Sequence, residues 1–203
     1  MDIIVTTATP PTIAAKRATS VIPIVFAVAG DPVGTGLVAS LARPGGNVTG
    51  LSLQATDLAG KRIELLREVV PCLRRLAIMG NVGNSQVVLE MGEVQAAART
   101  LGLDVITSEI RRAEDIAPAF EAFKGRADAL FVILDPVISS NRLPINTFAL
   151  RARLPTMRGV RDLVEAAGLM SYGPNFPDLF RRSAGLGPQQ DWRVRRTATS
   201  SIT

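Results

Sequence analysis

Short apolar runs rich in β-branched residues alternate with longer amphipathic stretches along most of this chain. The short runs have the length and composition of buried strands. The stretch Asp57–Val70 instead places Ile63, Leu66 and Val70 on one stripe, which predicts an amphipathic helix that Pro71 ends.

The expected strands cover residues 2–7, 22–28, 48–51, 75–79, 103–108, 129–134 and 154–158, with one more after Gly168. The expected helices cover residues 12–20, 37–41, 57–70, 86–101, 113–124 and 141–152, with one more from near Pro177. Strict alternation of strands and helices predicts an α/β fold with doubly wound parallel sheets.

The stretch Ile22–Ser52 combines a strand, a loop, a short helical pattern and a second strand. Gly30 and Asp31 follow the buried strand directly, and open α/β sheets bind ligands just past the carboxyl ends of their strands. Asp31 is also explained as a turn or helix N-cap residue. The Gly-Thr-Gly at residues 34–36 lacks the third glycine of a dinucleotide-binding motif, and no P-loop lysine follows, so a nucleotide is not the expected ligand.

The composition narrows the chemistry that the chain can perform. Its 203 residues are 47% apolar, enough to bury the core of one large domain or of two small lobes. With no histidine and one cysteine, Cys72, the sequence excludes Ser-His-Asp and Cys-His catalysis, histidine-ligated metals and disulfide frameworks. The net charge of +5 comes without a basic helix or an aromatic platform, so nucleic acid is not an expected partner. No apolar run approaches the roughly 20 residues that cross a bilayer, so direct membrane insertion is not expected either.

Residues 22–52, IPIVFAVAGDPVGTGLVASLARPGGNVTGLS, resemble a bacterial family of ABC-transporter substrate-binding proteins whose better-known members bind aromatic amino acids. The resemblance extends over roughly residues 1–185. It implies the type I periplasmic-binding-protein fold, with two Rossmann-like lobes and a ligand cleft between them. It also implies capture of a small molecule, in particular an amino acid, without chemistry or cofactor, an ABC permease as partner, and a periplasmic location. The ligand-sensing domain of a transcriptional regulator with the same fold is the alternative.

The two ends of the chain differ from this family. We expect a partial first lobe at residues 1–71, a second lobe at 72–167, a return segment at 168–185 and a disordered tail at 186–203. The family's export signal and its initial strand and helix have no counterpart before Asp2, so the N-terminus is expected to be truncated, the first lobe incomplete and the C-terminus altered. Expressed as written, without a signal peptide, the chain would stay in the cytoplasm.

A threonine-rich loop, Thr7, Ala8 and Thr9, joins the first expected strand to the first helix. Free backbone N–H groups at the start of a helix suit a carboxylate, and proline is tolerated in a first helical turn. Capping of the helix by Thr9 explains the same residues without a ligand.

Asn81 and Asn84 follow the first strand of the expected second lobe, and Asp135 follows its third. All three lie on the same carboxyl edge of the predicted sheet, which faces the cleft. An amino acid needs a carboxylate for its ammonium group and N–H or hydroxyl donors for its carboxylate. Asp135 suits the first role and Thr7 with Thr9 the second, although turn formation explains each residue too.

Tyr172 follows a strand next to the crossing between the expected lobes. It can close over a ligand ring by stacking, or it can pack in a core or hinge. By the resemblance, Gly30 and Asp31 border the ligand. Arg158 stands where the resemblance implies an aromatic residue, which leaves the identity of the ligand open. We expect no catalytic residue and no metal site.

Overall fold

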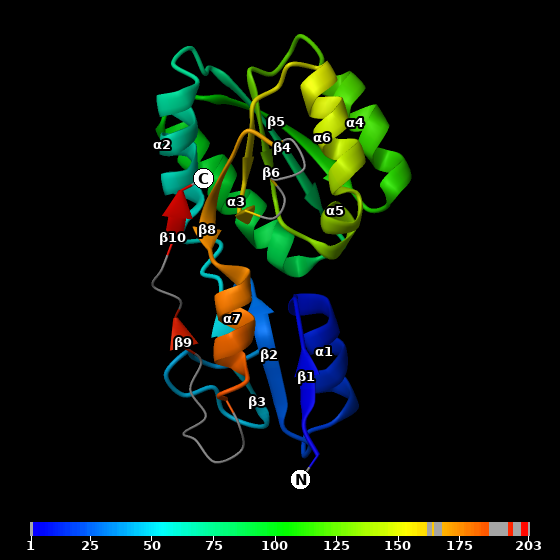
Figure 1. The fold of residues 1–203 in the computed structure, drawn as a ribbon, viewed down its shortest axis with the longest axis vertical. Helices are drawn as coiled ribbons and strands as arrows, with labels where there is room; N and C mark the ends of the chain where they lie inside the picture. The colour runs from blue at the N-terminus through cyan, green and yellow to red at the C-terminus, as the bar shows by residue number, and fades with distance from the viewer. Residues whose placement is uncertain (1, 162–163, 165–167, 187–194, 197–199, 203) are drawn as a thin grey trace. The chain divides into compact units, whose positions relative to one another are not determined.

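The structure is a computed structural model that describes residues 2–161, 164, 168–186, 195–196 and 200–202. The chain divides into two compact units (Figure 1). The first unit is residues 1–55 with 174–200, and the second is residues 56–173 with 201–203. The sequence analysis places residues 56–71 in the first lobe. In the structure they belong to the second unit, because Ile63 and Leu66 of helix α2 (Ala59–Val69) pack in its core.

The first unit is built on a parallel sheet in the order β1-β2-β3-β9. Its strands are β1 (Ile4–Thr6), β2 (Ile24–Ala29), β3 (Val48–Ser52) and β9 (Arg195–Arg196). Every residue of β2 is buried, as expected for an inner strand of a parallel sheet. Helix α1 (Thr9–Ala18) packs on β1 and β2, and α7 (Phe176–Ser183) packs on β2 and β3.

The helix expected at residues 37–41 does not form, and the chain between β2 and β3 runs through turns instead. Leu37 and Val38 are nevertheless buried in the core of the first unit. Gly36, Gly45 and Gly46 have φ angles of +72°, +67° and +96°, which interrupt a right-handed helix and which glycine adopts readily. The apolar pattern therefore predicted the burial of Leu37 and Val38 correctly, whereas the prediction of a helix at residues 37–41 was wrong.

The second unit is built on a sheet in the order β10-β8-β7-β6-β4-β5, in which the pairs from β8 to β5 are parallel. Its strands are β4 (Arg75–Asn81), β5 (Asp104–Ile110), β6 (Ala129–Val132), β7 (Thr156–Arg158), β8 (Met170–Pro174) and β10 (Ser200–Ile202). The inner strand β4, which lies between β6 and β5, alternates its side chains between the two faces. Leu76 and Ile78 belong to one core cluster, and Ala77 and Met79 to the other.

Helices cover both faces of this second sheet (Figure 1). Helix α2 and helix α3 (Ser85–Thr100) enclose one cluster, which includes Phe131. The short helix η1 (Ala113–Asp115) leads into α4 (Ile116–Phe123), which with α5 (Pro136–Ser140) and α6 (Arg142–Arg151) encloses the other cluster. Parallel strands with helices on both faces confirm the predicted doubly wound α/β class.

Within the described residues, no helix is long and apolar enough to cross a membrane. The expected disordered tail, residues 186–203, falls largely outside the described residues. Of that tail the structure describes Leu186 and two short strands, with β9 paired to β3 and β10 next to β8.

Candidate functional site

Asn81, Asn84 and Asp135 come together at the carboxyl edge of the second sheet. Asn81 is the last residue of β4, Asn84 is the N-cap of α3, and Asp135 follows β6 and is the N-cap of α5. The carboxylate of Asp135 accepts hydrogen bonds from Nδ2 of Asn81 and from Nδ2 of Asn84, each at 3.0 Å. It also accepts one from the backbone N–H of Val137 at 2.7 Å. The predicted juxtaposition of the three residues is therefore present.

The amide oxygens of both asparagines are held as well. Asn81 Oδ1 accepts from the N–H of Gly83 at 2.9 Å, and Asn84 Oδ1 accepts from the N–H of Gln86 at 3.1 Å. These bonds orient both amide groups so that their N–H donors point at Asp135. Asp135 is 3% exposed, and no cationic side chain pairs with it in the described part of the chain. Neutral donors alone therefore stabilise a buried carboxylate, which keeps the capacity to bind a cation.

In the first unit, the threonine loop has an uncommon backbone conformation. Ala8 has φ 66° and ψ 161°, a region that is nearly restricted to glycine and that costs about 1–3 kcal/mol. Its N–H donates to the carbonyl of Val28 at 2.8 Å, and its carbonyl accepts from Thr12 Oγ1 at 2.7 Å. Thr12, which the sequence analysis did not single out, also lies 2.8 Å from Thr6 Oγ1. These bonds lock the loop that leads into α1.

Helix α1 offers few backbone donors at its start. Thr9 is the first helical residue, and Pro10 and Pro11 follow it without N–H groups. The N-cap is Ala8, not Thr9, and no side-chain capping bond is present in this described segment. Two of the backbone N–H groups at the start of this helix, which we expected to suit a carboxylate, are therefore missing, because proline has none. Thr9 is buried and Thr7 is exposed.

Gly30 and Asp31 follow β2 directly, as predicted, and Asp31 closes a turn. Its Oδ1 accepts from the N–H of Gly34 at 2.8 Å, and its carbonyl accepts from the N–H of Thr35 at 3.1 Å. Gly30 accepts from the N–H of Ala55 at 3.3 Å. The turn explanation accounts for these bonds, and a ligand role for the two residues stays a prediction.

Tyr172 lies in β8, half-buried, and packs against the core cluster that α2 and α3 enclose. Its carbonyl accepts from Nε of Arg62 at 2.8 Å. Arg62 Nη1 in turn lies 2.8 Å from Glu90 Oε1, and Gln86 Nε2 donates to Glu90 Oε2 at 2.9 Å. Burial lowers the pKa of Arg62, and the neighbouring Glu90 partly opposes that effect. This buried network fastens α2 to α3 and β8.

Two arginines are more deeply buried than their sequence context suggests. The helical pattern puts Arg62 outside the apolar stripe of α2, yet it is 3% exposed. Arg158, the last residue of β7, is 0% exposed. Its Nη2 donates to Oδ1 of Asn146 on α6, and burial lowers its pKa to about 10.

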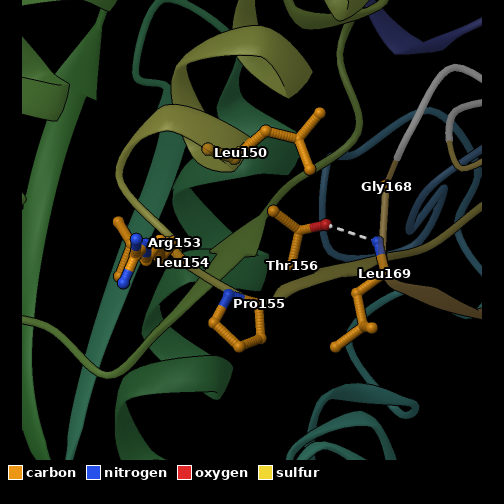
Figure 2. Close-up of a pocket in the computed structure, with 8 residues that line it drawn as sticks. Leu150, Arg153, Leu154, Pro155, Thr156, Gly168 and Leu169 are labelled. Atoms are coloured by element: carbon orange, nitrogen blue, oxygen red, sulfur yellow. Dashed lines mark hydrogen bonds between the residues drawn. The ribbon is translucent and has the colours of Figure 1, made fainter.

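An apolar hollow of about 400 Å³ opens at the other end of β7 (Figure 2). Leu150 and Leu169 line it, together with Thr156, whose Oγ1 accepts from the N–H of Leu169 at 3.0 Å. None of the predicted site residues lines this hollow. It lies at the amino end of the strand, whereas ligand contacts in open α/β sheets lie at the carboxyl end.

Comparison with known proteins places this chain in a family. A model of the family described as "ABC transporter substrate binding protein" matches residues 1–184. The chain belongs to this family. A tyrosine-binding protein of Clostridioides difficile is 27% identical to this family member over 185 residues, which are 91% of this chain and 53% of that protein. The chain thus spans about half the length of this curated relative.

Two solved structures are similar over 99% of the chain at 26% identity. One is a conserved domain protein of Vibrio cholerae, with a TM-score of 0.92 and 70% of that chain covered. The other is an ABC domain of Streptococcus pneumoniae in complex with L-Trp, with a TM-score of 0.91 and 72% of that chain covered. The likeness to solved binding proteins confirms the type I periplasmic-binding-protein fold and the resemblance stated from the sequence.

Proposed function

We propose that this substrate-binding protein captures an amino acid for an ABC importer and releases it chemically unchanged. Family membership supports a binding role, and two relatives support the amino-acid class, because one is a tyrosine-binding protein and the other is in complex with L-Trp. The regulator alternative is not favoured, since the matching family is that of transporter proteins. A permease partner and a periplasmic location belong to the same proposal.

The cluster of Asn81, Asn84 and Asp135 is the observation that carries this proposal. A buried carboxylate that is held only by neutral donors suits the ammonium group of an amino acid, which is the role that we assign to Asp135. Charge-assisted hydrogen bonds of this kind contribute about 1.5–3 kcal/mol. Thr7 and Thr9 remain the sequence-based candidates for the ligand carboxylate.

Thermal-shift screening of the twenty amino acids tests the ligand class. A ligand present at 100 times its Kd stabilises a protein by about 2.7 kcal/mol. For a chain of this length that gain corresponds to a rise in Tm of roughly 5–11 °C. Stabilisation by sugars or nucleotides alone would contradict the proposal.

Calorimetry then tests the role of the ammonium group. The amino acid that raises the Tm most is compared with the same acid lacking its amino group, a comparison that needs no mutation. If Asp135 binds the ammonium group, the deaminated acid binds about 10- to 150-fold more weakly, which corresponds to the loss of one charge-assisted hydrogen bond. Equal affinities would remove Asp135 from the role that we assign to it.

A further inference from the structure

Arg158 is a buried charged side chain that forms no ion pair with the residues that the structure describes. Its single hydrogen bond runs from Nη2 to Oδ1 of Asn146, and Nε and Nη1 have no partner among the residues that the structure describes. A guanidinium group has five N–H donors and is cationic at neutral pH. Buried charges in proteins are normally paired, because an isolated ion in the interior is costly. Arg158 therefore keeps donors with which it can bind an anion.

The unpaired cation stands at the sheet edge that carries Asp135. Strands β6 and β7 are adjacent, with Val132 opposite Arg158 in register, and Asp135 follows Val132 by three residues. Neighbouring strands lie about 4.8 Å apart. Asp135 and Arg158 form no ion pair with each other in the described part of the second unit. Two opposite charges thus occupy neighbouring strand ends without neutralising one another.

We propose that Arg158 binds a carboxylate of the captured amino acid, beside the ammonium group that Asp135 binds. This inference rests on the proposed function and names the residue that receives the ligand's negative charge. An amino acid carries an ammonium group and a carboxylate on the same α-carbon. It therefore complements an anion and a cation that lie at adjacent strand ends. A carboxylate can also accept two parallel N–H bonds from one guanidinium group.

The threonine loop is a weaker candidate for the same role. Pro10 and Pro11 remove two of the backbone donors at the start of α1. Within the described residues, Nε and Nη1 of Arg158 make no hydrogen bond, and one bond to Asn146 holds the side chain. We therefore expect its side chain to turn toward an incoming carboxylate.

A purely structural role for Arg158, which would join β7 to α6 through Asn146, makes different predictions. Arg158→Met keeps much of the side-chain length and removes the charge. Asn146→Asp is nearly isosteric and supplies a carboxylate to Arg158 within the protein. Arg151→Met is the matched control, because Arg151 is an exposed arginine on the same helix as Asn146.

Calorimetry on the four folded chains compares the best amino acid of the thermal-shift screen with its α-amide. We expect α-amidation to weaken binding to the wild type and to Arg151→Met about 10- to 150-fold. Arg158→Met should bind the amino acid and its amide about equally. Asn146→Asp should raise the Tm of the ligand-free protein and weaken amino-acid binding. A second comparison uses glutamate and glutamine as ligands. If the wild type prefers glutamate and Arg158→Met abolishes that preference, Arg158 binds the side-chain carboxylate.

An Arg158→Met protein that keeps the full wild-type preference for the carboxylate over the amide, in both comparisons, would overturn the inference and leave amino-acid capture intact. If Arg158→Met fails to fold, Asn146→Asp decides: unchanged affinity and unchanged Tm would also overturn the inference. If no amino acid stabilises the wild type, the proposed function itself fails.

Discussion

Replacement of Glu90 by glutamine should destabilise the second unit strongly, although it exchanges only one carboxylate oxygen for an NH2 group. Arg62 and Glu90 are 3% and 2% exposed, and their side chains meet at 2.8 Å. Removing one partner of a buried ion pair lowers the free energy of unfolding by about 3–5 kcal/mol, because the remaining charge stays buried without a partner. The new amide group also presents N–H donors toward Arg62 or toward Gln86, both of which already donate to Glu90.

The expected loss is large enough for a direct measurement. At about 2–4 °C per kcal/mol for a chain of this length, 3–5 kcal/mol corresponds to a fall in Tm of roughly 6–20 °C. Urea unfolding followed by circular dichroism gives the free energy directly. Glu64→Gln is the matched control on α2, the helix that carries Arg62, because its partner Lys61 is 3.3 Å away and both side chains are about half exposed. Exposed pairs of this kind contribute at most about 1 kcal/mol.

A second variant separates the charge from the packing. Arg62→Met with Glu90→Met removes both charges and keeps apolar volume, so it should be close to the wild type in stability or above it. If Glu90→Gln loses less than 1 kcal/mol, in line with Glu64→Gln, the network is not the lock between α2, α3 and β8 that the distances indicate.

Two further predictions concern backbone spacing and pH. Gly50→Ala should prevent folding or lower the Tm steeply, because its Cβ would overlap with the backbone oxygen of Phe26, whereas Gly60→Ala in α2 should stabilise by about 0.5–1 kcal/mol; thermal unfolding compares the two. Hydrogen bonds from Arg75, above all from its side chain, lower the pKa of Asp128 in the folded protein. The stability that this carboxylate contributes is therefore fully present above its unfolded pKa of about 3.9. It is lost as the pH falls through the lower folded pKa. Asp128→Asn should make the free energy of unfolding depend less on pH in that acidic window, as urea unfolding at several pH values would measure. An unchanged dependence on pH would contradict this assignment.

Local patterns predicted strands β1–β8 and most of the helices, because burial of a strand leaves a direct trace in the sequence; β9 and β10 lie in the tail that was expected to be disordered. The run at residues 22–28 became β2, all of whose residues are buried. The apolar residues at 76–79 became part of β4, an inner strand of the second sheet, and all of them are buried. Residues 37–41 show the limit of this reasoning. Their apolar side chains are buried as the pattern indicates, but a pattern of burial does not specify a backbone, and Gly36 at φ +72° directs the chain into turns.

The buried arginines could not be predicted because their environment depends on distant residues. A helical stripe assigns Arg62 to solvent, and Glu90, which pairs with it, lies 28 residues further along the chain. The same contact ties α2 to α3, and both helices lie in the second unit. Arg158 had only one trace in the sequence, its presence where the resemblance implies an aromatic residue.

The candidate ligand residues raise a different problem, because a turn and a binding site use the same side chains. Asp135 both caps α5 through the N–H of Val137 and holds Asn81 and Asn84. Satisfied bonds of this kind are common where Asp or Asn is the N-cap, so they do not by themselves separate the two explanations. What separates them is charge: a cap needs only an acceptor, whereas a zwitterion needs both a carboxylate and a cation that have not neutralised one another. Our proposal assigns that second condition to Asp135, which follows β6, and to Arg158, which ends β7. It depends on the structure, because the burial of Arg158 and the bonds that its Nε and Nη1 do not make with the described residues are not visible in the sequence.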